Sequence, residues 1–163
     1  MAIDKSVIGK PTGSSRVAVE RGPSANFAKA VMDENPVYSS PEAARRAGLA
    51  GIPVPPTFGF CMGHWGSFPE IQPDEKVEGN PAFEIIMERM AKGGLVLHGE
   101  QEFIYHRPVV VGDQLIGKGK VVDAYEKESK GHTMTFVVSE TVWSDDKTSE
   151  PVLTTRFNLI HRA

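Results

Sequence analysis

Regular alternation of apolar and polar residues runs through the second half of the chain and predicts β-strands there. Strict alternation over several residues is typical of a strand with one buried face and one polar face. Four strands are predicted, over residues 95–106, 114–126, 131–144 and 152–161. In the first of them, Leu97 and Phe103 fall in the same phase and are expected on one face. Short turns join the last three strands, which predicts an antiparallel meander.

The first half of the chain predicts helices and loops instead. A short alternating strand at 15–20 precedes four predicted helices, over 23–32, 41–47, 58–65 and 82–92. Ser40 and Pro41 form a typical helix start, with a capping side chain followed by proline at the first helical position. Gly48 is placed to end that helix, because glycine readily adopts the left-handed conformation found at helix C-termini.

The predicted helix at 58–65 is apolar on every side and follows a proline-rich loop at 51–56. A helix of this kind is normally buried. The whole pattern therefore predicts an α+β protein in which a curved antiparallel sheet of five or more strands wraps one buried helix. Such a sheet keeps an exposed edge strand, and edges are commonly covered by another subunit. We therefore expect a dimer.

Length and charge narrow the class of protein. A chain of 163 residues suits one domain spanning 1–163. The formal net charge of −3 argues against a nucleic-acid-binding domain, which usually carries an excess of basic residues. The single cysteine excludes an internal disulfide and a cysteine-based zinc site. With no secretory leader and no apolar run of about 18 residues, we expect no membrane span and a cytoplasmic location.

The segment Asp33-Glu34-Asn35-Pro36-Val37-Tyr38 is the most informative in the chain. In isolation, a D-x-N-P stretch is typical of a capped turn. Here it resembles the signature of the MaoC-like hydratases and dehydratases, which is D-x-N-P, an apolar residue and histidine. In that family a short helix and a proline-rich approach to a central helix follow the signature. Tyr38 stands where the signature has histidine.

The resemblance extends over nearly the whole chain. Its landmarks include the runs Pro55-Pro56-Thr57-Phe58 and Tyr105-His106-Arg107-Pro108. The tyrosine, the Pro-Pro-Thr-Phe run and the long insert at 67–93 are similar to one branch, the FAS1-like N-terminal dehydratase domains. That branch includes the non-catalytic A-type subunits of mycobacterial hydroxyacyl-ACP dehydratase. The resemblance implies a hot-dog fold, a curved antiparallel β-sheet wrapped around a central α-helix.

The family's chemistry explains these residue types. Hydration of an enoyl thioester needs water aimed at the β carbon, a base and an acid, and an Asp–His pair can supply both. The developing enolate oxygen needs a donor, and a backbone N–H near Thr57 and Phe58 is suitably placed where the central helix begins. Asn35 would orient the water or its acid partner. Tyr38 is a poor base at neutral pH, because the reference pKa of a phenol is about 10.

Two sets of candidate site residues follow. The candidate catalytic residues are Asp33, Asn35 and Tyr38, with the family's histidine absent. The candidate substrate-binding residues are Pro56, Thr57, Phe58 and Met87. We expect no metal and no cofactor; coenzyme A or an acyl carrier enters only as the thioester substrate.

Several functions fit these residues. The resemblance favours a component of a 2-enoyl-thioester hydratase or 3-hydroxyacyl-thioester dehydratase, in which this A-type subunit houses the acyl chain beside a His-bearing catalytic subunit. A self-sufficient homodimeric enoyl-CoA hydratase that uses Asp33 is one alternative. An acyl-CoA thioesterase is another, but such enzymes usually carry a carboxylate near the central helix, and residues 58–66 contain none. A non-catalytic acyl-binding module also fits.

Other reactive side chains have simpler interpretations. His64 lies in the apolar helix and is expected in the core, and Cys61 in the same helix is expected to be an inert thiol. His98, Glu100 and Glu102 share a predicted strand face, which we interpret as a solvated or interface face rather than a metal site.

Overall fold

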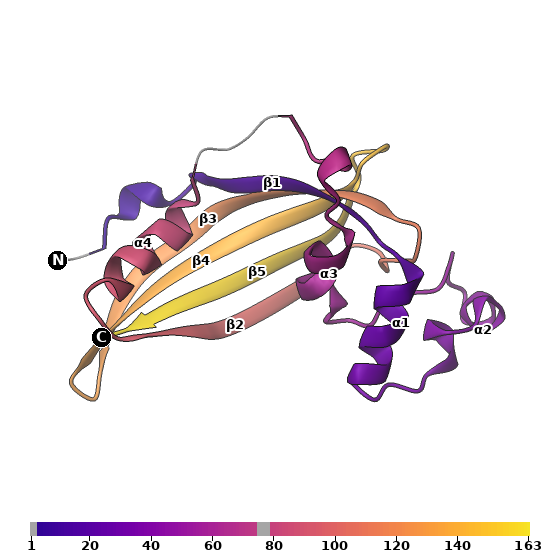
Figure 1. Ribbon diagram of the computed structural model, residues 1–163, viewed down its shortest axis with the longest axis horizontal. Coiled ribbons are helices and arrows are strands. Elements are labelled where there is room, and N and C mark those ends of the chain that lie inside the picture. Colours follow the sequence, from indigo (N-terminus) through magenta and orange to yellow (C-terminus); the bar gives the residue numbers. More distant parts are fainter. Residues whose placement is uncertain (1–2, 75–78) are drawn as a thin grey trace.

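One antiparallel sheet with helices against one of its faces makes up the fold of the computed structural model, which describes residues 3–74 and 79–163 (Figure 1). The strand order is β1-β3-β4-β5-β2. The strands are β1 (Pro11–Ala18), β2 (Leu95–Tyr105), β3 (Gln114–Ser129), β4 (His132–Asp145) and β5 (Pro151–Arg162). The helices are α1 (Arg21–Ala30), α2 (Pro41–Arg46), α3 (Phe58–Gly66) and α4 (Pro81–Met90). The predicted α+β arrangement and the meander of β3, β4 and β5 are confirmed.

Local signals place α2 as the sequence predicts. The Ser40 hydroxyl accepts a hydrogen bond from the Ala43 N–H at 3.2 Å, which caps the first turn. Gly48 has a φ of 78°, the left-handed conformation that ends a helix. The described residues also form three short 3-10 helices, η1 (Lys5–Val7), η2 (Pro36–Tyr38) and η3 (Pro69–Ile71).

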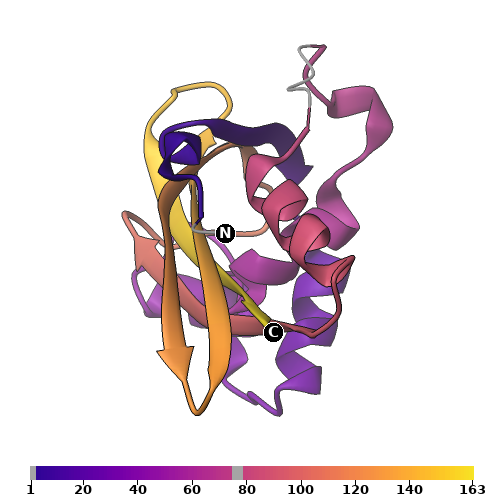
Figure 2. The ribbon, with the colours of Figure 1, turned by 90° about the vertical axis from the view of Figure 1, so that its left-hand side faces the viewer.

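Two clusters of apolar side chains fill the space between the sheet and its helices. Phe58 and Met62 of α3 pack with Val17 and Leu153 in one cluster. Ile86 of α4 packs against β3 and β4 in the other. The sheet curls over both helices (Figure 2), and α4 and α3 lie one after the other along its inner face (Figure 1).

A bulge in β2 changes which face its residues occupy. The pairing of β2 with β5 shifts register between His98 and Gln101. An extra residue in one strand reverses the alternation beyond it. Leu97 is consequently 39% exposed, whereas Phe103 packs against the core around α3. The prediction that Leu97 and Phe103 share one face is therefore wrong.

The central helix α3 is buried on one side only. Phe58 is 1% exposed, but Phe60, on another side of the helix, is 44% exposed. Trp65 is 47% exposed, although its ring stacks on the Phe58 ring with 6.0 Å between centroids. His64 is exposed as well. The predictions of a fully buried helix and of a core histidine at 64 are wrong for the single chain, because the sheet and α1 cover just one face of α3.

The two edges of the sheet differ in their environment. At the β1 edge, the Gln72 side chain accepts from the Arg16 N–H at 3.1 Å and donates to the Arg16 carbonyl at 2.9 Å. This amide completes the hydrogen bonding that a neighbouring strand would supply. Gln72 lies in the long insert at 67–93, of which residues 75–78 fall outside the described residues. No strand of the described chain pairs with the far side of β2.

Candidate functional site

The turn that carries Asp33 is positioned by the end of α1. Met32 adopts a left-handed conformation with a φ of 56°, and the Asp33 N–H donates to the Ala28 carbonyl at 2.9 Å. Helix α1 is itself anchored by Phe27, whose ring meets the ring of Phe58 edge-to-face with 5.5 Å between centroids. The start of α3 and the Asp33 turn are thereby held in one unit.

Inside the turn, two side chains cap backbone groups. Asp33 Oδ1 accepts from the Asn35 N–H at 3.0 Å, and Asn35 Oδ1 accepts from the Val37 N–H at 3.1 Å. The capped turn that a D-x-N-P stretch predicts is therefore present. Asp33, Asn35 and Tyr38 nevertheless line a common hollow of about 330 Å³, which we call the Asp33 hollow. The structure thus brings the three candidate catalytic residues together.

Tyr38 also borders a second, more apolar hollow of about 460 Å³. We call it the Tyr105 hollow, and its walls include Tyr105, Leu49, Val54 and Pro56. The Tyr105 hydroxyl donates a hydrogen bond to the Pro56 carbonyl, which ties β2 to the loop that leads into α3. Sequence reasoning identified Tyr105 as a family landmark but not as a residue of the site, because its contact with Pro56 depends on the tertiary fold.

Both phenols of this region are held in their neutral form. Burial raises the pKa of Tyr105 to about 12, and the nearby Tyr38 adds to the shift. The pKa of Tyr38 is raised by burial and further by the negative charge of Asp33. At neutral pH both groups are therefore hydrogen-bond donors and not bases.

The start of α3 offers fewer donors than its position predicts. Thr57 makes no side-chain cap, and the Phe58 N–H donates to the Pro55 carbonyl at 2.9 Å. The Phe58 ring is part of the core. Within residues 3–74 and 79–163, the N–H groups of Thr57 and Gly59 have no hydrogen-bond partner.

Met87 lies apart from the other candidate residues. It belongs to α4, is 46% exposed and lines neither hollow. Helix α4 covers one end of the sheet, whereas α1 and α2 lie at the other (Figure 1). The structure therefore brings Pro56 into a common hollow with Tyr38, whereas Thr57 and Met87 line neither hollow.

The Arg107 guanidinium and the Cys61 thiol are already engaged or shielded. Arg107 forms two hydrogen bonds with Asp113, at 2.8 and 3.1 Å, which raise its pKa. Burial raises the pKa of the Cys61 thiol, as expected for an inert cysteine. No group of three His, Cys, Asp or Glu side chains within the described ranges is arranged to hold a metal ion, and no helix there is long and apolar enough to cross a bilayer.

The curled sheet, the central helix and the D-x-N-P turn beside its start define a hot-dog protein with the turn of the MaoC-like hydratases and dehydratases. The family model "FAS1-like, dehydratase domain region" matches residues 6–155, and the chain belongs to this family. A UPF0336 protein of Streptomyces avermitilis is 33% identical over 166 residues, covering 100% of this chain and 97% of the relative.

Solved structures support the same fold. The ChsH1-ChsH2 complex from Mycobacterium tuberculosis aligns with a TM-score of 0.73 at 24% identity, covering 93% of this chain and 83% of that one. The HadBC (3R-hydroxyacyl-ACP dehydratase) complex from the same organism aligns with a TM-score of 0.68 at 20% identity. The alignment covers 97% of this chain and 99% of that chain. At these identities the likeness establishes a shared hot-dog fold.

Proposed function

We propose that this chain is the substrate-binding, A-type subunit of a 2-enoyl-thioester hydratase or 3-hydroxyacyl-thioester dehydratase, and that a second hot-dog subunit supplies the catalytic histidine. The observation that carries the proposal is Tyr38. It occupies the histidine position of the turn, and burial together with Asp33 raises its pKa. A phenol that stays protonated can donate a hydrogen bond, but it cannot remove a proton from water at neutral pH.

The remaining parts of the site suit a thioester. The Tyr105 hollow has an apolar lining that includes Val37, Leu49 and Pro56, and it adjoins the start of α3. In the proposed complex the acyl chain occupies this hollow. The free N–H groups of Thr57 and Gly59 then face the thioester oxygen, on which negative charge develops. Adding or removing water needs no redox cofactor, so the only larger group required is the coenzyme A or acyl-carrier part of the substrate.

The surface around α3 and β2 suits a partner of the same fold. Phe60 contacts the rings of His98 and Phe157, with centroids 5.1 and 5.9 Å apart, and this aromatic cluster is partly exposed. The open edge of β2 borders it. A second hot-dog subunit would cover both the apolar cluster and the unpaired backbone groups of the strand. The two solved neighbours described above are themselves complexes.

Hydration of a short and a long trans-2-enoyl-CoA by the purified chain tests the proposal, with Asp33→Asn as the control. We expect no turnover from the folded chain alone and turnover when a His-bearing MaoC-like subunit is co-purified with it. Turnover by the chain alone that disappears in Asp33→Asn would replace the proposal with a self-sufficient homodimer. Release of free thiol would point to a thioesterase, and a stable complex with no turnover would leave only an acyl-binding module.

A further inference from the structure

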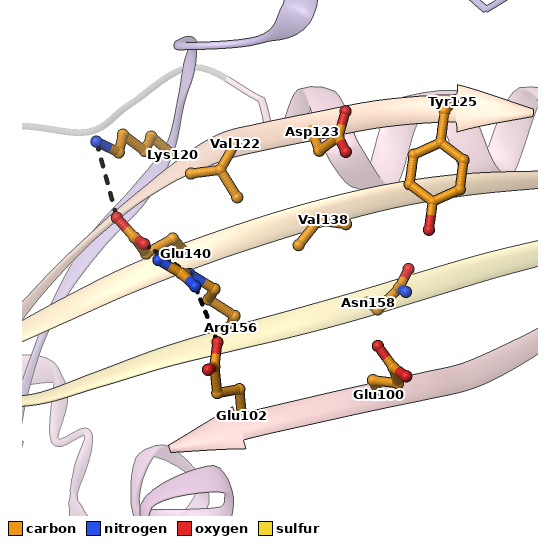
Figure 3. A pocket seen from close by; sticks show the side chains of 10 residues that line it. All are labelled: Glu100, Glu102, Lys120, Val122, Asp123, Tyr125, Val138, Glu140, Arg156 and Asn158. Atoms are coloured by element: carbon orange, nitrogen blue, oxygen red, sulfur yellow. Dashed lines mark hydrogen bonds and ion pairs between the residues drawn. The ribbon is translucent and has the colours of Figure 1, made fainter. Parts of the chain in front are cut away.

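The face of the sheet turned away from the helices carries a row of charges that compensate one another. Lys120, Glu140, Arg156 and Glu102 are register neighbours on four adjacent strands. Arg156 lies 2.9 Å from Glu140 and 3.0 Å from Glu102, and Lys120 lies 3.7 Å from Glu140 (Figure 3). Two cations and two carboxylates alternate here, so this row is a cross-strand ladder that stabilises the sheet.

The next row along the strands lacks such compensation. Asp123, Val138 and Asn158 are register neighbours, and Glu100 of β2 lies beside Asn158 (Figure 3). Asp123 accepts a hydrogen bond from the adjacent Ala124 N–H at 2.8 Å. Among the residues that the structure describes, neither Asp123 nor Glu100 forms an ion pair. Two carboxylates therefore face one side of the sheet without a cation.

Asn158 adds an independent feature to this row. Asn158 is only 8% exposed, yet its Oδ1 atom receives no hydrogen bond within the described chain. Buried polar atoms in proteins are almost always hydrogen-bonded, and an orphaned one costs free energy. The amide oxygen therefore calls for a donor that comes from outside the chain.

These side chains line a hollow of about 480 Å³, which we call the outer hollow. Both flanking strands are irregular at this level, β3 between Val121 and Asp123 and β2 between His98 and Gln101. Such bulges bend a strand locally. The short Val138 side chain lies in the middle of the row, and the Tyr125 ring closes one end (Figure 3).

The lining defines the chemistry of a ligand. It must bring donors and positive charge, because the free polar groups are carboxylates and an amide oxygen, and its stem must tolerate valine and tyrosine walls. A primary ammonium group has three N–H donors and no acceptor. We propose that the outer hollow binds primary alkylammonium groups at two positions along the row, one at Asp123 and one where Glu100 and Asn158 Oδ1 accept the N–H groups. A polyamine and a lysine side chain of another protein share this chemistry.

Titration of the isotope-labelled full chain with n-butylammonium, followed by amide NMR, tests this site. We expect saturable shifts at Asp123, Val138 and the Asn158 side chain, with binding in the millimolar range. Asp123→Asn and Glu100→Gln should each weaken binding at their own position about tenfold, because each removes a charge-assisted hydrogen bond. Glu70→Gln, an exposed carboxylate on η3, is the matched control and should leave binding unchanged. Tetramethylammonium, which has no N–H donor, should bind at least about tenfold more weakly.

Asn158→Leu separates binding from folding. It removes the orphaned amide, so the variant should unfold at the same or a higher temperature while losing butylammonium binding beside Glu100. Unchanged binding in this variant, or equal affinity for tetramethylammonium, would overturn the proposal, as would shifts that sodium chloride reproduces at equal ionic strength. Tighter binding of putrescine than of Nα-acetyl-lysine methylamide would identify a polyamine as the source, and the reverse order a protein lysine.

Discussion

At the scale of single residues, the side chain at position 38 determines whether the Asp33 turn can catalyse acid–base chemistry. Asp33 and Asn35 line one hollow with Tyr38, so histidine is the part that the proposed site lacks. Tyr38→His should therefore raise the rate of enoyl-CoA hydration by the chain at least about 100-fold, the usual contribution of a placed general base. Steady-state assays at pH 7 measure the gain. Tyr38→Phe is the matched control and should gain nothing; equal rates in the two variants would show that the rest of the site is incompetent.

Tyr105 gives the fold a dependence on alkaline pH. Its pKa is about 12 in the folded chain, against a reference value of about 10 for the unfolded chain. The neutral phenol is favoured by folding, so its contribution to stability is complete below pH 10 and is lost as the pH rises towards 12. Chemical denaturation across this range should show a decline that is smaller in Tyr105→Phe. A variant with the same decline as the parent chain would contradict this assignment.

Residue-level chemistry could be predicted from the sequence only where it is local. The capped turn from Asp33 to Val37 depends on neighbouring residues, and its hydrogen bonds follow from residue types alone. The contact of Tyr105 with the Pro56 carbonyl joins residues far apart in the chain. No spacing rule reveals such a contact, and for the same reason Met87 was grouped with residues that the fold keeps apart from it.

At the scale of elements, helix α3 offers a matched pair of glycines. A Cβ atom at Gly59 would lie 2.7 Å from Leu153 Cδ2, in the closely packed core, whereas one at Gly63 would meet nothing within 4 Å. Gly59→Ala should lower the free energy of unfolding by about 1–3 kcal/mol through overpacking. Gly63→Ala should raise it by up to about 1 kcal/mol, because alanine is the better helix former. Urea denaturation measures both, and equal effects would mean that α3 is not packed as described.

The elements themselves were largely predictable, because hydropathic period is a local property. The strands from Gln114 onward match the predicted ones to within a few residues. The prediction failed on which face of β2 each residue occupies. The bulge between His98 and Gln101 exchanges the two faces, and the sequence does not reveal it because apolar and polar residues alternate regularly on both sides of it. The edge contact of Gln72 was likewise missed, since a glutamine in a polar loop carries no sign of the strand it will cover.

At the scale of the whole molecule, α3 is apolar on every side but exposed on one side in the single chain. Hydropathy reflects the surface buried in the functional assembly, and the single chain covers one face of this helix. Phe60 and the free edge of β2 remain exposed. A hydrophobic surface beside an unpaired strand is typical of a subunit interface. The mismatch between pattern and exposure is therefore itself support for a partner.

Phe60 is the residue with which to test that interface. Phe60→Asp places a charge in the aromatic cluster with His98 and Phe157, where a partner would have to desolvate it. We expect sedimentation to show a loss of self-association or of binding to the His-bearing subunit, with little change in the unfolding of the isolated chain because Phe60 is already partly exposed. Ile8→Asp, which charges another exposed apolar side chain remote from α3, should leave association intact. If both variants associate as the parent chain does, the partner must use another face, and the free edge of β2 must be covered in some other way.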